Sequence, residues 1–403
     1  MKTKAGHLTY CTNIHAGETW EHNFDALRNA IPGIKTKLSP DKPFGIGLRL
    51  SHLASLELGS DNNLQQFISW LDEKNCYVFT MNGFPYGGFH HTRVKDQVHT
   101  PDWTTQDRVV YTIQLFRILA KLLPQGIQGG VSTSPLSYKP WHGKETAEAK
   151  AAFEAATENI IKVLEELINI KETTGQVLHL DIEPEPDGLV ENGSEFIDWY
   201  QEYLVPRGTA HLIKSKEWNE TTATDAIHEH IRLCYDVCHF AVGYEDHQRI
   251  LSKLAELQIR IGKIQISAAL KAPMAALPSD REVVVRAFDA FNESTYLHQV
   301  IALQDTTHLL RYPDLPEALA DAMNVSTREW RAHFHVPVFI KDYGVLKSTQ
   351  EDIEAILELH RQSNLSEHLE VETYTWEVLP EKLKMPLTDS IVRELEWVVA
   401  RLE

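Results

Sequence analysis

Acidic residues follow an apolar strand pattern in the segment LHLDIEPEPDG, residues 178–188. Apolar and polar residues alternate up to position 182, and two prolines then prevent the strand from continuing. A carboxylate at the end of an apolar strand is costly unless a partner compensates its charge. We therefore predict a catalytic or metal-binding role for Glu183, and we expect Glu185 and Asp187 to be solvated loop residues.

Polar residues with useful chemistry also end or follow other apolar runs. They are Asp236 and His239 in YDVCHF, Gln265 in IQIS, His333 and His335 in HFHVPVF, and Glu377 in TYTWEVLP. Carboxylates that converge in a dry site repel each other, and a divalent cation between them removes that repulsion. Oxygen ligands with one or two imidazoles suit Mn²⁺, Mg²⁺ or Co²⁺, whereas more imidazole favours Zn²⁺. The pattern predicts a divalent metal beside Glu183, Asp236 and Glu377.

The elements that position these residues alternate between strands and helices. Strands are predicted over 7–15, 44–52, 76–84, 126–135, 177–186, 232–240, 262–270, 333–340 and 370–379, and amphipathic helices over 63–75, 104–124, 149–175, 246–258, 348–360 and 387–402. The strands are nearly uniformly apolar, as in sheets covered on both faces, and the alternation implies parallel strands joined by helices. Because the chain has no GxGxxG turn of an open dinucleotide-binding sheet, we predict an α/β fold of the (β/α)8 TIM-barrel type.

Nine predicted strands are one more than a barrel needs. We interpret residues 271–345 as an elaborated loop after the seventh strand and residues 370–379 as the eighth strand. The alternative, in which 333–340 is a barrel strand, stays open. No linker or repeat divides the chain, so we expect residues 1–403 to form a single TIM-barrel domain. Active sites of such barrels lie at the carboxyl ends of the strands, which would bring the polar residues together.

Charge and composition restrict the partners of the protein. The 403 residues carry a formal net charge of −18, which disfavours binding to nucleic acid or to anionic membranes. No run of 18 apolar residues occurs, and the first residues lack the apolar stretch of a signal peptide. The four cysteines lie in or beside predicted strands and form no CxxC pair, so we expect buried free thiols and a cytoplasmic location.

A long predicted loop, residues 82–103, is rich in aromatic and basic residues. Its length is typical of a lid or a binding surface. We predict that Phe84 and Tyr86 stack on a ring or sugar face, and that His91 and Arg93 contact substrate, with Arg93 suited to an anionic group. The alternative is that the loop serves only for packing. Four more candidates for lining a substrate pocket are His15, Arg49, Trp141 and His333.

The order of these motifs is similar to that of the xylose-isomerase-like TIM-barrel superfamily, which includes sugar isomerases, ketose 3-epimerases and endonuclease IV. The matching features are a strand ending in Glu183, the D-x-x-H of Asp236 and His239, a polar seventh strand and the terminal Glu377. The resemblance implies that Glu183, Asp236 and Glu377 hold the metal. It also implies that His239 contacts the substrate.

The sequence departs from the epimerases of this superfamily on the seventh strand. Gln265 stands where those enzymes have a histidine ligand. We therefore expect Gln265 among the metal ligands, and His335 or His333 as the source of the missing imidazole.

Longer stretches resemble the EboE family of metabolite-traffic proteins. They are HLTYCTNIHAGETW (7–20), NGFPYGGFHHTRVKDQVHTPDW (82–103), STSPLSYKPW (132–141), HFHVPVF (333–339) and ETYTWEVLP (372–380). Members of that family accompany a prenyltransferase-like membrane protein, a sugar-phosphate-cyclase-like enzyme and a TatD-like hydrolase. Their operons are tied to moving a secondary-metabolite precursor toward the periplasm. The resemblance implies a role in precursor traffic and a transient contact with a membrane partner, and it implies no particular reaction.

Three functions are compatible with these observations. The first is a metal-dependent isomerase or epimerase of a small polyhydroxylated, sugar-like or cyclitol-like metabolite. One of Glu183 and Glu377 would remove a proton beside a carbonyl, the other would return it, and His239 would orient a hydroxyl. The second is a carrier that binds such a metabolite in the same pocket without converting it. The third, an endonuclease-IV-like phosphodiesterase, is disfavoured by the acidic net charge.

Overall fold

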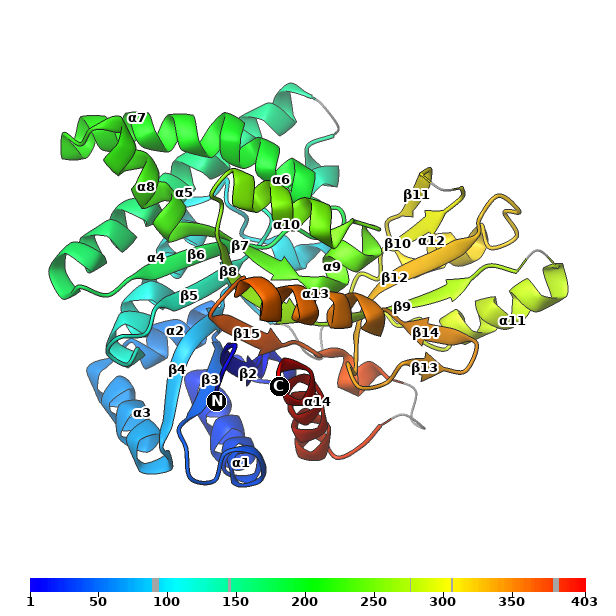
Figure 1. Cartoon of the computed structure of the whole chain (residues 1–403), viewed down its shortest axis with the longest axis horizontal. Helices are drawn as coiled ribbons and strands as arrows, with labels where there is room; N and C mark the ends of the chain where they lie inside the picture. Colours follow the sequence, from blue (N-terminus) through cyan, green and yellow to red (C-terminus); the bar gives the residue numbers. More distant parts are fainter. Residues whose placement is uncertain (89–93, 144–145, 276, 306, 380–383) are drawn as a thin grey trace.

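Eight parallel strands form a barrel in the computed structural model, which describes residues 1–88, 94–143, 146–275, 277–305, 307–379 and 384–403 (Figure 1). Around the barrel they are β2 (Gly6–Tyr10), β15 (His368–Val371), β8 (Ile261–Ile266), β7 (Ile231–Asp236), β6 (Leu178–Ile182), β5 (Gly129–Thr133), β4 (Cys76–Asn82) and β3 (Phe44–Arg49). A short strand, β1 (Lys2–Thr3), pairs antiparallel with β2. The predicted TIM-barrel class is confirmed.

The barrel closes where β2 approaches β3. A parallel bridge joins Cys11 to Gly47, and the backbone N–H of Gly47 donates to the Thr9 hydroxyl at 3.0 Å. A Cβ atom at position 47 would lie 1.9 Å from a carboxylate oxygen of Glu370 and 2.7 Å from the carbonyl oxygen of Tyr10. Only glycine therefore lets the two edges meet at this point.

Helices surround the barrel and cover its strands, as Figure 1 shows. The six predicted helices are present as α3 (Asp61–Lys74), α4 (Gln106–Leu122), α5 (Ala147–Thr174), α10 (His247–Glu256), α13 (Gln350–Ser363) and α14 (Leu387–Leu402). Helix α5 is followed by Gly175 with φ of 77°, the left-handed cap typical of a helix end. The structure adds α1 (Trp20–Leu38), α2 (His52–Leu58), α6 (Gly193–Trp199), α7 (Val205–Lys216), α8 (Glu220–His230) and α9 (Val237–Val242).

The predicted elaboration after the seventh barrel strand is present, and its residues form a second sheet. Its antiparallel strands, in spatial order, are β11 (Leu309–Tyr312), β10 (Val300–Leu303), β12 (Glu329–Val336), β9 (Ala268–Pro273), β14 (Leu346–Ser348) and β13 (Asp342–Tyr343). Helices α11 (Pro278–Asp289) and α12 (Leu315–Ala320) accompany it. The alternative that made residues 333–340 a barrel strand is wrong, since β12 pairs with β9 and β10. Long-range antiparallel pairing of this kind leaves no local periodic signal.

The eighth barrel strand is shorter than predicted and lies earlier in the chain. It ends at Val371, and residues Thr375–Val378 form a 3-10 helix, η5. Glu372 therefore follows the strand directly, at the position that the sequence analysis assigned to Glu377. Glu377 itself lies in η5, and its side chain is outside the described part of the structure.

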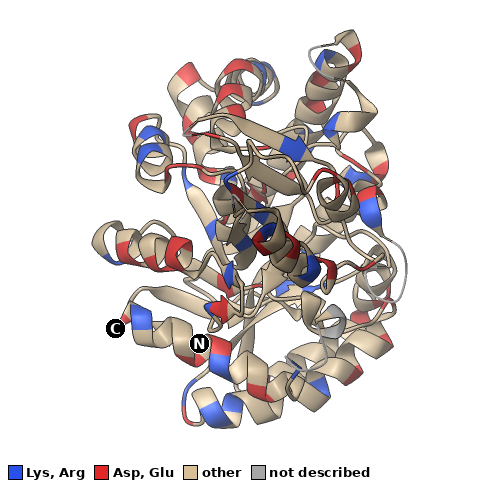
Figure 2. Ribbon diagram, turned by 90° about the vertical axis from the view of Figure 1, so that its right-hand side faces the viewer, with Lys and Arg blue, Asp and Glu red and all other residues tan. Residues whose placement is uncertain are grey.

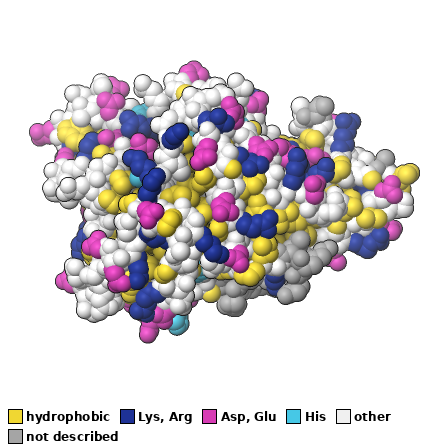
Figure 3. All heavy atoms as spheres, turned by 60° about the horizontal axis from the view of Figure 1, so that its bottom comes forward, with side chains coloured by type: hydrophobic (Ala, Val, Ile, Leu, Met, Phe, Trp, Pro, Cys, Tyr) yellow, Lys and Arg dark blue, Asp and Glu magenta, His cyan; other side chains and the backbone are white. Residues whose placement is uncertain are grey.

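The distribution of charged residues and the burial of the cysteines agree with the predictions made from the composition. Acidic and basic residues are interspersed on the outer helices, and the face in Figure 3 mixes both signs with hydrophobic side chains (Figures 2 and 3). The four cysteines are buried and unpaired, as predicted. Within the described residues, no helix has both the length and the apolar character needed to cross a membrane.

Candidate active site at the barrel mouth

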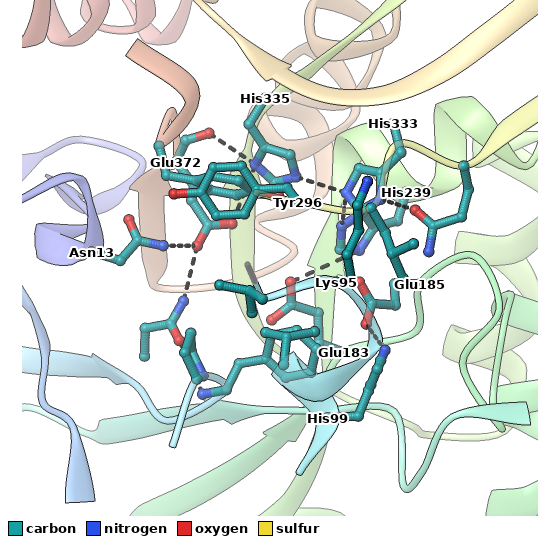
Figure 4. A pocket seen from close by; sticks show the side chains of 18 residues that line it. Asn13, Lys95, His99, Glu183, Glu185, His239, Tyr296, His333, His335 and Glu372 are labelled. Carbon is teal, nitrogen blue, oxygen red and sulfur yellow. Dashed lines mark hydrogen bonds and ion pairs between the residues drawn. The ribbon is translucent and has the colours of Figure 1, made fainter. Parts of the chain in front are cut away.

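Three buried carboxylates meet where β6, β7 and β15 end. Glu183 follows β6, Asp236 ends β7 and Glu372 follows β15. One oxygen of each lies within 4.8 Å of the others. Because all barrel strands run in parallel, their carboxyl ends share one mouth, and this is where the predicted cluster forms. Figure 4 shows Glu183 and Glu372 pointing toward the same space.

Side-chain amides hold Glu372 in place. Its Oε1 accepts hydrogen bonds from Asn13 Nδ2 at 2.7 Å and Asn82 Nδ2 at 2.9 Å, and its Oε2 accepts one from Gln265 Nε2. Asn82 ends β4, and Asn13 lies in η1 (Thr12–Ile14) after β2. Three side chains, at or just after the ends of β2, β4 and β8, therefore fix the orientation of this one carboxylate.

Gln265 on β8 lies among the three carboxylates. Its Nε2 is 3.2 Å from Glu183 Oε1 and 3.2 Å from Asp236 Oδ2, besides its bond to Glu372. Burial, reinforced by the neighbouring carboxylates, raises the pKa of Glu183 well above its usual range and the pKa of Glu372 to about 8. The cluster therefore favours protonated carboxyl groups or a bound cation.

Asp236 has a structural role as well as its place in the cluster. It caps α9, because its Oδ1 accepts from the His239 backbone N–H at 3.2 Å and from Ser267 Oγ at 2.7 Å. Helix capping explains the D-x-x-H spacing, since the third residue of the helix then returns toward the cap. The two roles use different oxygens, because Oδ2 faces Gln265.

Three imidazoles lie beside the carboxylates. His239 comes from α9, and His333 and His335 come from β12 of the second sheet. The Nε2 of His333 lies 3.1 Å from that of His239 and 3.3 Å from that of His335. Burial lowers the pKa of all three rings, and the neighbouring imidazoles contribute for His239 and His333. The second sheet thus completes the barrel mouth.

Glu185 is buried, contrary to the expectation of a solvated loop residue. It is 5% exposed and faces His99, whose Nε2 lies 3.3 Å from Glu185 Oε1. Burial raises the pKa of Glu185 well above its usual range and lowers the pKa of His99 to about 3. His99 belongs to η2 (Lys95–His99), so the long loop after β4 covers this side of the site. Asp187 is only partly buried.

The cavity over these groups is small and closed by two segments. It encloses about 50 Å³, and its walls include Phe84, Pro85, Tyr296 and Tyr374. The backbone N–H groups of Val94 and Lys95 donate to the Thr295 carbonyl oxygen at 2.8 and 3.1 Å, and Lys95 Nζ pairs with Asp314. We call the contacts of Lys95 with Thr295 and Asp314 the latch. The latch therefore ties the loop after β4 to the inserted segment beside the cavity, which Lys95 itself lines.

The predicted substrate residues divide into those at the cavity and those elsewhere. Phe84 and His333 line it, and so do the predicted ligand His335 and the predicted catalytic residue His239. His91 and Arg93 lie outside the described residues.

Four other predicted substrate residues are not among the described residues that line the cavity. The Arg49 guanidinium donates to the carbonyl oxygens of Gly17 and Gly87, and Tyr86 stacks on a neighbouring histidine. The His15 ring bonds to a tyrosine hydroxyl, and the indole N–H of Trp141 donates to an aspartate.

Several site residues were missed by the sequence analysis. They are Glu372, Asn13, Asn82, Glu185 and His99. Asn13, Asn82 and Glu372 are polar residues at or just after the ends of apolar strands, so the criterion that selected Glu183 could have found them. The position of His99 depends on the path of a long loop, which carries no periodic signal.

The donor groups fit a divalent cation. Glu183 Oε2 is buried and has no hydrogen-bond partner among the described residues, so one carboxylate oxygen of the cluster is uncompensated. Three carboxylates with a nearby amide are the oxygen-rich set that hard divalent cations prefer. Glu183, Asp236 and Glu372 are the residues that would hold it.

Comparison with known proteins agrees on the fold. No protein-family model and no curated protein matches the sequence. A xylose isomerase-like TIM barrel protein from Mycobacterium smegmatis, in complex with magnesium, is similar over 100% of this chain and 98% of its own, with 10% identity and a TM-score of 0.52. The IolI protein with a bound zinc atom matches over 98% of each chain (10% identity, TM-score 0.48). D-psicose 3-epimerase in the presence of D-fructose matches over 98% and 97% (10% identity, TM-score 0.47).

The chain therefore has the fold of a xylose-isomerase-like TIM barrel. To this fold it adds an antiparallel sheet after the seventh strand, and that sheet contributes side chains to the barrel mouth.

Proposed function

We propose that the protein is a metal-dependent isomerase or epimerase that acts on a small polyhydroxylated metabolite, either a sugar or a cyclitol. The observation that carries the proposal is the pair of buried carboxyl groups, Glu183 and Glu372, which contact the same amide at the barrel mouth. The pKa of Glu372, raised to about 8, brings its proton gain and loss within reach of neutral pH, as acid–base catalysis requires, and burial raises the pKa of Glu183 as well.

The proposed reaction consists of two proton transfers, one from a carbon atom of the substrate and one to a carbon atom. One of Glu183 and Glu372, as carboxylate, takes the proton from a carbon beside a carbonyl. The electron pair of that C–H bond forms a carbon–carbon double bond, and the π pair of the carbonyl moves onto its oxygen. The other, as carboxylic acid, returns a proton to carbon, which restores the carbonyl. A divalent cation held by Glu183, Asp236 and Glu372 would polarise that carbonyl as a Lewis acid.

Other side chains would bind the substrate and exclude water. The aromatic walls Phe84, Tyr296 and Tyr374 suit the apolar face of a ring. The amides of Asn13 and Asn82 keep Glu372 oriented, so that it acts without reorganisation. Opening of the latch would admit the metabolite, and its closure would remove bulk water.

The wider setting rests on the resemblance to the EboE family. We propose that the metabolite is a precursor of a secondary-metabolite traffic system, and that a membrane protein of the same system contacts this protein transiently. Four buried free cysteines support a reducing compartment, the cytoplasm.

A carrier function is the second candidate, and the position of Gln265 favours it. Its Nε2 lies within hydrogen-bond distance of all three carboxylates, and its two N–H groups can donate to two of them at a time. A cluster satisfied in this way has less need of a cation, and without a cation the pocket would bind a metabolite without converting it.

A solvent-exchange experiment separates the two functions. The full-length protein is stripped with a chelator, reloaded with Mn²⁺ and incubated in D₂O with a panel of ketohexoses and keto-cyclitols. We expect metal-dependent deuterium incorporation, detected by mass spectrometry. Glu183→Gln and Glu372→Gln should each reduce the rate by at least about 100-fold. Glu158→Gln, on the exposed face of α5, is the matched control and should leave it unchanged.

The outcomes distinguish the proposals clearly. Incorporation that requires metal and both glutamates supports the isomerase. A panel member that binds, as measured by calorimetry, and returns without deuterium contradicts the isomerase and supports the carrier.

A further inference from the structure

The three imidazoles at the barrel mouth face one another through the same ring nitrogen. His333 Nε2 lies between its neighbours, 3.1 Å from His239 Nε2 and 3.3 Å from His335 Nε2. Figure 4 shows the three rings converging from two directions, His239 from the barrel and the other two from the second sheet. The sequence analysis assigned His239 to substrate, and it offered His335 or His333 as a single imidazole ligand beside the carboxylates.

The opposite nitrogen of each ring fixes its protonation. His239 Nδ1 lies 2.9 Å from the carbonyl oxygen of Pro184, and His335 Nδ1 lies 3.1 Å from that of Glu372. A carbonyl oxygen can only accept, so both Nδ1 atoms carry the proton. In a neutral imidazole the Nε2 atom then has a free lone pair.

His333 also carries its proton on Nδ1, and here the side-chain amide of Gln299 determines this. His333 Nδ1 lies 2.8 Å from Gln299 Oε1, and the amide of Gln299 is oriented by its own Nε2, which donates to the Pro186 carbonyl oxygen at 3.1 Å. The amide therefore presents its oxygen to His333, and His333 Nδ1 is the donor. All three Nε2 atoms are thus acceptors, and no described residue donates a hydrogen bond to them.

Three lone pairs this close need a positive group among them. A water molecule has two O–H donors and could satisfy only two of the three. A cation bound to all three satisfies each lone pair. Zn²⁺ binds imidazole nitrogen at about 2.0–2.1 Å, and tetrahedral geometry then separates two such nitrogens by roughly 3.3 Å. The two separations in the structure match this value.

The backbone of β12 is irregular at this position. Ala332 pairs with Leu270 and Val336 pairs with Ala268, so three residues of β12 lie opposite one residue of β9. These three residues are His333 to His335. Bulges of this kind redirect side chains and are common beside functional sites. Here the bulge directs two histidines of the added sheet toward the barrel.

We propose that His239, His333 and His335 form a second cation site, distinct from the carboxylate cluster and selective for Zn²⁺ or a similar nitrogen-preferring divalent ion. Asp236 lies between the two sites, with its oxygens 3.9 Å from His239 Nε2 and 4.0 Å from His335 Nε2. Hydrogen bonds from Nδ1 to carbonyl oxygens are the usual support of metal-binding histidines. The inference goes beyond the proposed function and does not depend on it.

Zinc binding to the stripped, full-length protein tests the proposal by competition with a chromophoric chelator. His333→Ala should weaken binding by at least about 100-fold, because even the loss of a supporting hydrogen bond costs about 10–100-fold. Gln299→Leu, which removes only the acceptor of the His333 proton, should weaken zinc binding by about 10–100-fold. His22→Ala, an exposed histidine of α1, is the matched control and should bind as the wild type does.

X-ray absorption of the zinc-loaded wild type tests the site without any variant. Three imidazole ligands support the proposal. No imidazole, or one, overturns it, and so does zinc affinity that His333→Ala leaves unchanged in a folded protein. Glu372→Gln should abolish deuterium exchange yet keep the three-imidazole spectrum, so the failure of one proposal is distinguishable from the failure of the other.

Discussion

Replacing Gln265 by leucine tests whether its amide holds the carboxylate cluster together. The substitution keeps nearly the same volume and removes both N–H donors. The amide contacts three carboxylates but has only two N–H groups, so at most two of these contacts are full hydrogen bonds. Because burial raises the pKa of Glu183 and Glu372, protonated carboxyl groups are favoured without a cation, and a hydrogen bond between neutral groups contributes about 0.5–1.5 kcal/mol. Gln265→Leu should therefore lower the free energy of unfolding by roughly 1–3 kcal/mol in metal-free protein.

Urea denaturation in the presence of a chelator measures this loss. Gln66→Leu, an exposed glutamine of α3, serves as the control and should change stability by less than about 0.5 kcal/mol. Adding Mn²⁺ should narrow the difference between Gln265→Leu and the wild type, because a cation replaces the missing donors. If the metal-free variant is as stable as the wild type, the amide does not compensate the carboxylates and the reasoning fails.

Three further predictions concern the surroundings of the site. Burial raises the pKa of Glu394 from 4.5 to about 7, so folding is favoured most at low pH and this contribution, about 3 kcal/mol, is lost as pH rises from about 4.5 to 7. Glu394→Gln should flatten that part of a urea-denaturation pH series, and an unchanged slope would contradict this. Lys263→Met leaves the buried Glu370 unpaired and should cost about 3–5 kcal/mol in urea denaturation, whereas adding Glu370→Leu should recover most of the loss. Asp314→Asn should weaken the latch by up to about 1 kcal/mol and speed amide exchange at Lys95 about 5-fold, measured by hydrogen exchange; unaltered exchange would show that the ion pair does not hold the latch.

The barrel strands and two of the three carboxylates in the cluster could be predicted because their signals are local. Glu183 follows a buried strand in which Leu178, Leu180 and Ile182 mark the apolar positions, and the spacing of Asp236 and His239 reflects a helix cap. Helix α1 was missed although Thr19 caps it, because Pro32 lies inside it and breaks the usual pattern.

The eighth strand was misplaced for a different reason. Tyr374 and Trp376 continue an alternation that suggests a strand. However, Tyr374 lies just before a 3-10 helix and Trp376 lies within it. Tyr374 packs on the His335 ring, with centroids 4.6 Å apart. Its burial comes from the second sheet rather than from strand pairing, and periodicity does not distinguish these two causes. Glu377 was consequently chosen in place of Glu372.

The hydrogen bond from Asn13 to Glu372 joins residues 359 positions apart, and two of the imidazoles come from a sheet inserted between the seventh and eighth strands. Contacts of such long sequence separation form late in folding, because a large loop entropy opposes them until the rest is in place. The chain therefore cannot assemble its binding groups until the last strand has closed the barrel and the insertion has docked. During refolding, cation binding should therefore occur after most tryptophan side chains have become buried. The rate of cation binding would then measure the final step of folding.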